Sequence, residues 1–165
     1  MKRLAYWSKP FDATVLAESK WKQDVTHKPR GLWFSVGSDW QRWCLAENFS
    51  LDRLRHLHEV TLLASARLLT LRDPLDLDAF SERYGRAWPF TRQSGRGAAN
   101  IDWRAVSYEY DAIEIAPYQW SRRFALSWYY GWDCASGCVW NAEALESIRH
   151  VRDRRRFART ENVDA

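Results

Sequence analysis

Large aromatic side chains are the feature that most limits how this sequence can fold. The 165 residues include 11 Trp, 7 Tyr and 7 Phe. Because each large ring buries roughly 150–250 Å² on folding, the chain needs a core that is unusually rich in aromatic residues. The same side chains also stack on nucleobases and on nicotinamide rings, so composition leaves both uses open.

The length and the balance of residue types predict one globular domain. A chain of 165 residues with 46% hydrophobic and 28% charged residues is ordinary for a single domain. We expect this domain to cover residues 1–159, followed by a frayed tail over 160–165. No apolar run approaches the roughly 20 residues of a membrane span, and the N-terminus lacks the apolar segment of a signal peptide. The sequence therefore predicts a cytoplasmic protein that does not contact a membrane.

Short alternating segments predict an α+β fold in which strands and helices are interspersed. The segments expected to form strands are 3–8, 31–36, 54–62, 66–71, 110–115 and 137–141. Helices are expected after Ser38, from Asp76 to a stop at Gly85, and from Asn100 or Asp102 to Glu109. The Gly-, Ser- and Arg-containing segment 86–100 is typical of a surface loop. Residues 142–156 fit either a final helix or a strand–turn segment.

Positive charge is concentrated at the two ends of the chain. The net charge is +4, but residues 1–30 and 149–165 together carry +7 and the middle of the chain carries −3. This distribution argues against a uniformly basic nucleic-acid module, although basic ends can contact a polyanion. The cluster of Arg152, Arg154, Arg155 and Arg156 is either a solvated face or a contact to phosphate groups.

The cysteines and histidines do not form a recognisable ligand set. Three cysteines are too few for a disulfide framework, and the segment 133–138 fits a turn in which Cys134 could be an accessible thiol. His56 and His58 would share one face of a strand, where they could bind a metal ion. We favour a half-exposed polar strand face for this pair, so no metal is expected.

Three segments are similar to those of a known enzyme family. They are residues 6–11 (YWSKPF), 28–35 (KPRGLWFS) and 110–120 (YDAIEIAPYQW). Their order and spacing resemble the ADP-ribosyltransferase-like family, in particular its small phage-encoded and toxin-type members. The resemblance implies a compact domain with a central, mostly antiparallel split sheet. It also implies a transferase that uses NAD as substrate, without a metal, and modifies a macromolecular target. That target would be a host protein or nucleic acid in the host cytoplasm.

The resemblance assigns roles to residues in these segments. Breaking the glycosidic bond of NAD produces a cation-like ribose, which a carboxylate stabilises in a dry pocket. Glu114 on the late strand is the expected catalytic acid, and Gln119 is the alternative if the strand register differs. The residues expected to bind NAD are Tyr6, Ser8, Lys9, Arg30, Trp33, Ser35 and Tyr118. Among these, Lys9 or Arg30 would meet the pyrophosphate.

Two other classes of function are open. The chain could be a non-enzymatic module that holds single-stranded nucleic acid by stacking and charge. It could also be a phage or mobile-element protein that blocks a host protein through an exposed Trp-rich patch. Trp33 on an apolar strand and Glu114 between two isoleucines each have an ordinary structural interpretation, as a core residue and as an acid on a solvated face.

Overall fold

A computed structural model describes residues 1–12, 14, 16, 21–86 and 99–153. The strands are β1 (Arg3–Trp7), β2 (Val25–Thr26), β3 (Leu32–Val36), β4 (His56–Leu62), β5 (Leu68–Leu71), β6 (Gly85–Arg86), β7 (Asn100–Asp102), β8 (Ala112–Ile115), β9 (Ser136–Val139) and β10 (Leu145–Asp153). The helices are α2 (Asp39–Ala46), α3 (Pro74–Tyr84) and α4 (Trp103–Glu109), with 3₁₀ turns η1 (Leu51–Leu54), η2 (Trp120–Arg122), η3 (Ser127–Tyr129) and η4 (Ala142–Ala144). The predicted α+β class is confirmed. The expected tail 160–165 and most of the expected loop 86–100 lie outside the described residues.

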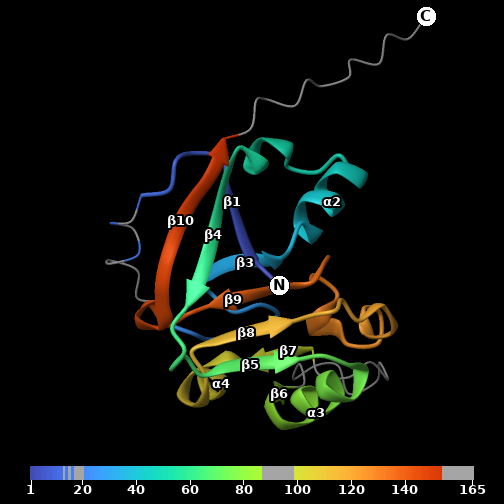
Figure 1. Cartoon of the computed structure of the whole chain (residues 1–165). Helices are drawn as coiled ribbons and strands as arrows, with labels where there is room; N and C mark the ends of the chain where they lie inside the picture. The colour runs from blue at the N-terminus through green and yellow to red at the C-terminus, as the bar shows by residue number, and fades with distance from the viewer. Residues whose placement is uncertain (13, 15, 17–20, 87–98, 154–165) are drawn as a thin grey trace, which may run out of the picture.

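The central sheet has seven strands and a corner. Its order is β10-β4-β1-β3-β9-β8-β5, and every neighbouring pair is antiparallel except β5 and β8. The mostly antiparallel sheet is therefore confirmed. β1 pairs along its whole length with β4, but it pairs with β3 only at Arg3–Val36 and Leu4–Ser35. Beyond those pairs β1 and β3 diverge, and the two halves of the sheet run across each other (Figure 1). The sheet therefore turns a corner where β1 leaves β3.

Aromatic residues fill the larger of two cores. This core lies between α3, α4, η3 and the β5–β8–β9 part of the sheet, and its largest fully buried side chains are Trp103, Trp128, Trp132 and Tyr129. The second core is mostly aliphatic and lies inside the corner of the sheet, where Ala5, Val60 and Val139 meet the Phe34 ring. The need for an aromatic core thus accounts for many of the tryptophans, though not for all of them.

Capping residues set where α3 and α4 begin. The Asp73 carboxylate accepts hydrogen bonds from the N–H groups of Leu75 (2.8 Å) and Asp76 (2.9 Å), with Pro74 in the first turn. The expected cap at Asp76 was wrong, because Asp73 already satisfies these donors. The expected stop at Gly85 is confirmed, and Asp102 caps α4 as one of the two alternatives predicted.

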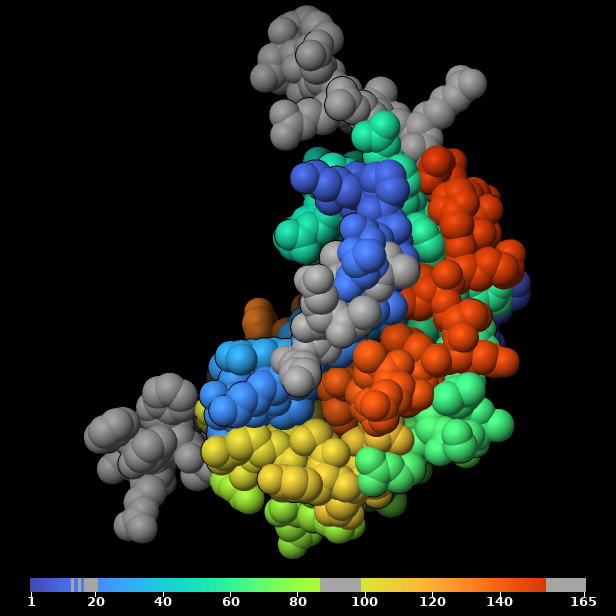
Figure 2. Space-filling view, turned by 90° about the vertical axis from the view of Figure 1, so that its left-hand side faces the viewer, coloured from blue at the N-terminus to red at the C-terminus, as the bar shows by residue number. Residues whose placement is uncertain are grey.

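The last described strand, β10, forms an edge of the sheet. It pairs with β4 along Leu145–Asp153 and carries register shifts after Leu145 and after His150. Over residues 142–153 this favours a strand, preceded by the short turn η4; the rest of the expected segment 142–156 lies outside the described residues. Figure 2 shows β10 along one side of the molecule, with its end uppermost. Within the described ranges, no helix has both the length and the apolar character that crossing a membrane requires.

Candidate functional site

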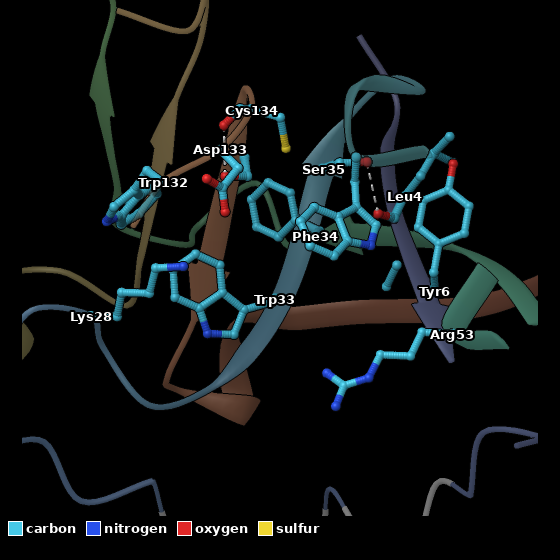
Figure 3. Close-up of a pocket in the computed structure, with 13 residues that line it drawn as sticks. Leu4, Tyr6, Lys28, Trp33, Phe34, Ser35, Arg53, Trp132, Asp133 and Cys134 are labelled. Carbon is cyan, nitrogen blue, oxygen red and sulfur yellow. Dashed lines mark hydrogen bonds between the residues drawn. The ribbon is translucent and has the colours of Figure 1, made fainter. Parts of the chain in front are cut away.

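A cavity of about 330 Å³ lies where β1 and β3 diverge. Ligand pockets commonly occupy roughly 300–1,000 Å³, so this cavity is large enough for part of a small molecule. It is lined by Leu4, Ala5, Tyr6, Lys28, Trp33, Phe34, Ser35, Trp40, Arg53, Trp132, Asp133, Cys134 and Ser136. Figure 3 shows Lys28, Trp33 and Trp132 on one side of this space and Tyr6 and Arg53 on the other. The corner of the sheet therefore creates the cavity.

Aromatic rings form one wall of the cavity. Trp33 meets Trp132 edge to face, with ring centroids 4.9 Å apart. The Lys28 ammonium lies 5.1 Å from the centre of the Trp33 ring, within cation–π distance. Trp33 is half-buried and packs against the aromatic core. It is therefore both a core residue and a surface that a planar ligand can contact.

One acidic residue, Asp133, lines the cavity. Its carboxylate pairs with the Arg123 guanidinium at 3.1 Å, and both side chains are largely buried. Burial raises the pKa of Asp133, while the positive charges of Lys28 and Arg123 act in the opposite direction. For Lys28, crowding by protein atoms lowers the pKa, and Asp133 opposes that change. The cavity thus combines a carboxylate with nearby cations.

Two serine hydroxyl groups line the cavity, and both are hydrogen-bonded to the main chain. The Ser35 hydroxyl lies within hydrogen-bonding distance of two carbonyl acceptors, those of Gly37 (2.9 Å) and Leu4 (3.3 Å). The Ser136 hydroxyl donates to the Cys134 carbonyl (2.9 Å). Their oxygen lone pairs can still accept a hydrogen bond from a ligand. Cys134 is 7% exposed, and burial raises the pKa of its thiol to about 12. The alternative that Cys134 is an accessible thiol is therefore wrong.

Three of the residues expected to bind NAD line this cavity. They are Tyr6, Trp33 and Ser35, so the first two predicted strands do border one cleft. Ser8 and Lys9 are exposed beyond the end of β1, outside the lining of the cavity. Arg30 is also exposed, and its peptide groups are held by the Gln23 side chain.

Glu114 lies on the other face of the sheet. Across the sheet, Glu114 pairs with Gly137, and Gly137 pairs with Phe34, so these three residues lie in one row. Trp33 and Ser35 lie in the neighbouring rows, where they pair with Cys138 and Ser136. Neighbouring residues of a strand point to opposite faces, so Glu114 and Trp33 point away from each other. Arg3 donates to the Glu114 carboxylate from Nε at 2.7 Å. The structure does not bring Glu114 into the cavity with Tyr6 and Trp33, as the sequence-based interpretation expected.

Gln119 and Tyr118 have structural contacts. The Gln119 amide is buried and donates to the carbonyls of Arg72 and Pro117, both at 2.8 Å. The Tyr118 ring stacks on Tyr129 at 5.3 Å, and burial raises the pKa of its hydroxyl to about 12. Neither residue lines the cavity. Of the Arg cluster expected to contact polyanions, Arg152 is exposed, and the other three residues lie outside the described part of the chain.

Sequence reasoning missed Lys28, Trp40, Arg53, Trp132 and Asp133 as cavity residues. Lys28 begins the segment 28–35, but nothing in its sequence surroundings distinguishes it from an ordinary surface lysine. Asp133 was interpreted as part of a turn. These residues come from separate parts of the chain, so only the corner of the sheet identifies them as one group.

Comparisons of this chain with protein-family models, with curated proteins and with solved structures find no match.

Proposed function

We propose that the cavity between β1 and β3 binds the nicotinamide and ribose of NAD, and that the protein transfers ADP-ribose to a macromolecular target. The observation that carries this proposal is that one cavity is lined by an indole ring, a carboxylate and two cationic side chains: Trp33, Asp133, Lys28 and Arg53. Indole rings offer a surface for a planar nicotinamide. Lys28 and Arg53 supply positive charge for a pyrophosphate, which both side chains bind well.

Asp133 replaces Glu114 as the acid assigned to the reaction. A carboxylate stabilises a cation-like ribose when it lies in a water-poor site beside it. Asp133 lines the cavity, whereas the Glu114 carboxylate is paired with Arg3 on the opposite face. The partner Arg123 holds the Asp133 carboxylate in place at 3.1 Å. The proposed reaction therefore uses Asp133 for the developing charge and Trp33 for the leaving nicotinamide.

The test is release of nicotinamide from NAD, with a cell lysate as the source of acceptors. We expect Asp133→Asn to reduce turnover by roughly 10²–10³-fold, the effect of losing one electrostatic group that acts in the transition state. NAD affinity should change much less. The matched control is Glu114→Gln, which removes a charge of the same type outside the cavity and should leave turnover near the wild-type value. Thermal unfolding of both variants shows that each is folded.

The proposal fails if the wild-type chain releases no nicotinamide and gains no thermal protection from NAD. It also fails if Glu114→Gln abolishes turnover while Asp133→Asn does not. Protection should follow RT ln(1 + [L]/Kd) for a ligand that binds only the folded state. NAD protection without nicotinamide release would leave a binding protein and overturn the transferase assignment.

A second candidate function rests on an exposed aromatic patch. Trp120, Phe124 and Tyr130 are 65%, 72% and 57% exposed. Their ring centres lie 5.7, 5.9 and 5.6 Å from the Arg123 guanidinium. Aromatic rings beside a cation are a surface on which bases of single-stranded nucleic acid stack. If this is the function, a labelled oligonucleotide should bind with steep salt dependence, and Trp120→Ala should weaken binding without any effect of NAD.

A further inference from the structure

Four polar side chains gather where β4 and β10 run side by side. His58 is level with His150, and His56 is level with Asp153. His150 and Asp153 are three positions apart, so in a regular strand they would point to opposite faces. The register shift between His150 and Arg152 adds a residue and turns Asp153 to the face that carries the histidines. The bulge therefore assembles a group that sequence spacing does not show.

Three of these side chains have donor atoms close enough to share one ion. The Asp153 carboxylate oxygen Oδ1 lies 2.6 Å from His56 Nδ1 and 2.9 Å from His150 Nε2. The three donor atoms all lie within 4.8 Å of one another. His56 is buried, whereas His150 and Asp153 are exposed, so one side of the group is open to solvent. Two imidazole nitrogens and one carboxylate oxygen form a donor set typical of zinc and related ions.

The fourth side chain, His58, gives an independent indication. It is 5% exposed, and its ring contacts those of Trp7 at 4.8 Å and His150 at 5.1 Å. Its Nδ1 has no hydrogen-bond partner among the described residues. A buried polar nitrogen without a partner is unfavourable, and a ligand or water held beside His150 would supply one. The expected half-exposed polar face was wrong, because His56 and His58 are both buried.

We propose that His56, His150 and Asp153 bind a divalent transition-metal ion, with zinc as the ion to test. Ligand atoms about 2.0–2.1 Å from zinc lie roughly 3.3 Å apart in a tetrahedron. The two hydrogen bonds to Asp153 must therefore lengthen by less than about 1 Å to admit the ion. The two histidine nitrogens, which lie within 4.8 Å of each other, must approach by up to about 1.5 Å. The His150 and Asp153 side chains are exposed, so rotation about their side-chain bonds can supply these changes. Three protein ligands leave a fourth position for water or for a substrate, which is the arrangement of catalytic rather than structural zinc sites.

The test is zinc binding by the full chain, measured by equilibrium dialysis with metal analysis and by calorimetry. We expect one zinc ion per wild-type chain. His150→Gln and Asp153→Asn should each weaken the affinity by on the order of 100-fold, since each removes one ligand from a site with few. Both substituted side chains are exposed, so the variants should remain folded. The matched control is His27→Gln, an exposed histidine on a segment outside this group.

A second readout uses Co²⁺ as a spectroscopic probe in place of zinc. The visible spectrum of the wild-type chain should change on binding, and this change should be lost in the His150→Gln/Asp153→Asn double variant. The proposal is overturned if the wild-type chain retains no zinc. It is also overturned if the double variant retains as much zinc as His27→Gln. Neither measurement involves NAD, so the outcome is independent of the transferase proposal.

Discussion

Asp111 connects three parts of the sheet, and Asp111→Asn should destabilise the fold in a pH-dependent way. Its carboxylate accepts hydrogen bonds from the Arg67 main-chain N–H (2.9 Å), from Arg67 Nη2 (2.7 Å) and from Asn141 Nδ2 (3.0 Å). These bonds join the start of β5 to the start of β8 and to the segment after β9. Asparagine keeps the size of the side chain but removes its charge and one acceptor.

The magnitude follows from the pKa of Asp111. Hydrogen bonds from Arg67, and to a smaller extent from Asn141, lower the pKa of Asp111 from 3.8 to about 2. Burial of the carboxylate acts in the opposite direction. Asp111 is 6% exposed, but the Arg67 side chain that it pairs with is 53% exposed, so solvent screens part of this interaction. At about 1.4 kcal/mol per pKa unit, the charged carboxylate contributes at most about 2 kcal/mol to the free energy of unfolding.

The direction of the pH dependence is fixed by the lowered pKa. The unfolded chain binds the proton of Asp111 more tightly than the folded chain does, so acid favours unfolding. The contribution is complete above about pH 5 and is lost as the pH falls through 3.8 towards about 2. The wild type should therefore exceed Asp111→Asn by up to about 2 kcal/mol at pH 7, and the difference should shrink below pH 4.

Urea unfolding followed by tryptophan fluorescence measures this difference at each pH. Asp52→Asn is the matched control, because Asp52 is an exposed carboxylate on η1. Its effect should stay within about 0.5 kcal/mol at pH 7. A difference between wild type and Asp111→Asn that does not change between pH 7 and pH 2.5 would refute the electrostatic reasoning. A difference below about 0.5 kcal/mol at pH 7 would refute the magnitude.

Four further predictions concern packing, backbone conformation, an ion pair and the thiols. Gly137→Ala should lower the free energy of unfolding by at least about 3 kcal/mol in a urea titration, because the new Cβ would lie 2.2 Å from the Ile113 carbonyl. Gly37→Ala, with open space and a φ of +59°, should cost about 1–2 kcal/mol. A double-mutant cycle between Arg3 and Glu114, paired at 2.7 Å, should give a coupling of about 1 kcal/mol or more in the same assay. The three cysteines are buried and free, so a thiol reagent should label about three groups only after denaturation.

Local pattern predicted the strands well, but it did not predict which face each side chain occupies. The expected strands 3–8, 31–36 and 110–115 correspond to β1, β3 and β8 within one or two residues. The face depends on pairing across strands, and a shift of one position reverses it. Glu114 illustrates this, because its strand was predicted and its pairing with Gly137 places it away from the cavity.

Both candidate sites depend on features that no single segment contains. The cavity arises where β1 leaves β3 after two residue pairs, and the residues missed there come from loops and turns. The histidine group depends on a bulge in β10, a segment that fitted either a helix or a strand. A bulge adds one residue to one strand only, so spacing along the chain gives no sign of it.

Strand β1 separates the two candidate sites, and this leads to a last prediction. Tyr6 lines the cavity, whereas the next residue, Trp7, contacts His58 beside the proposed zinc ligands. Adjacent residues of a strand point to opposite faces, so a ligand in one site does not touch the other. Sites without shared contacts contribute additively to stability within about 0.3–0.5 kcal/mol. Protection by NAD and zinc together should therefore equal the sum of the separate effects in thermal unfolding. If the stabilisation by both ligands together exceeds that sum by more than about 1 kcal/mol, binding at one site strengthens binding at the other through β1.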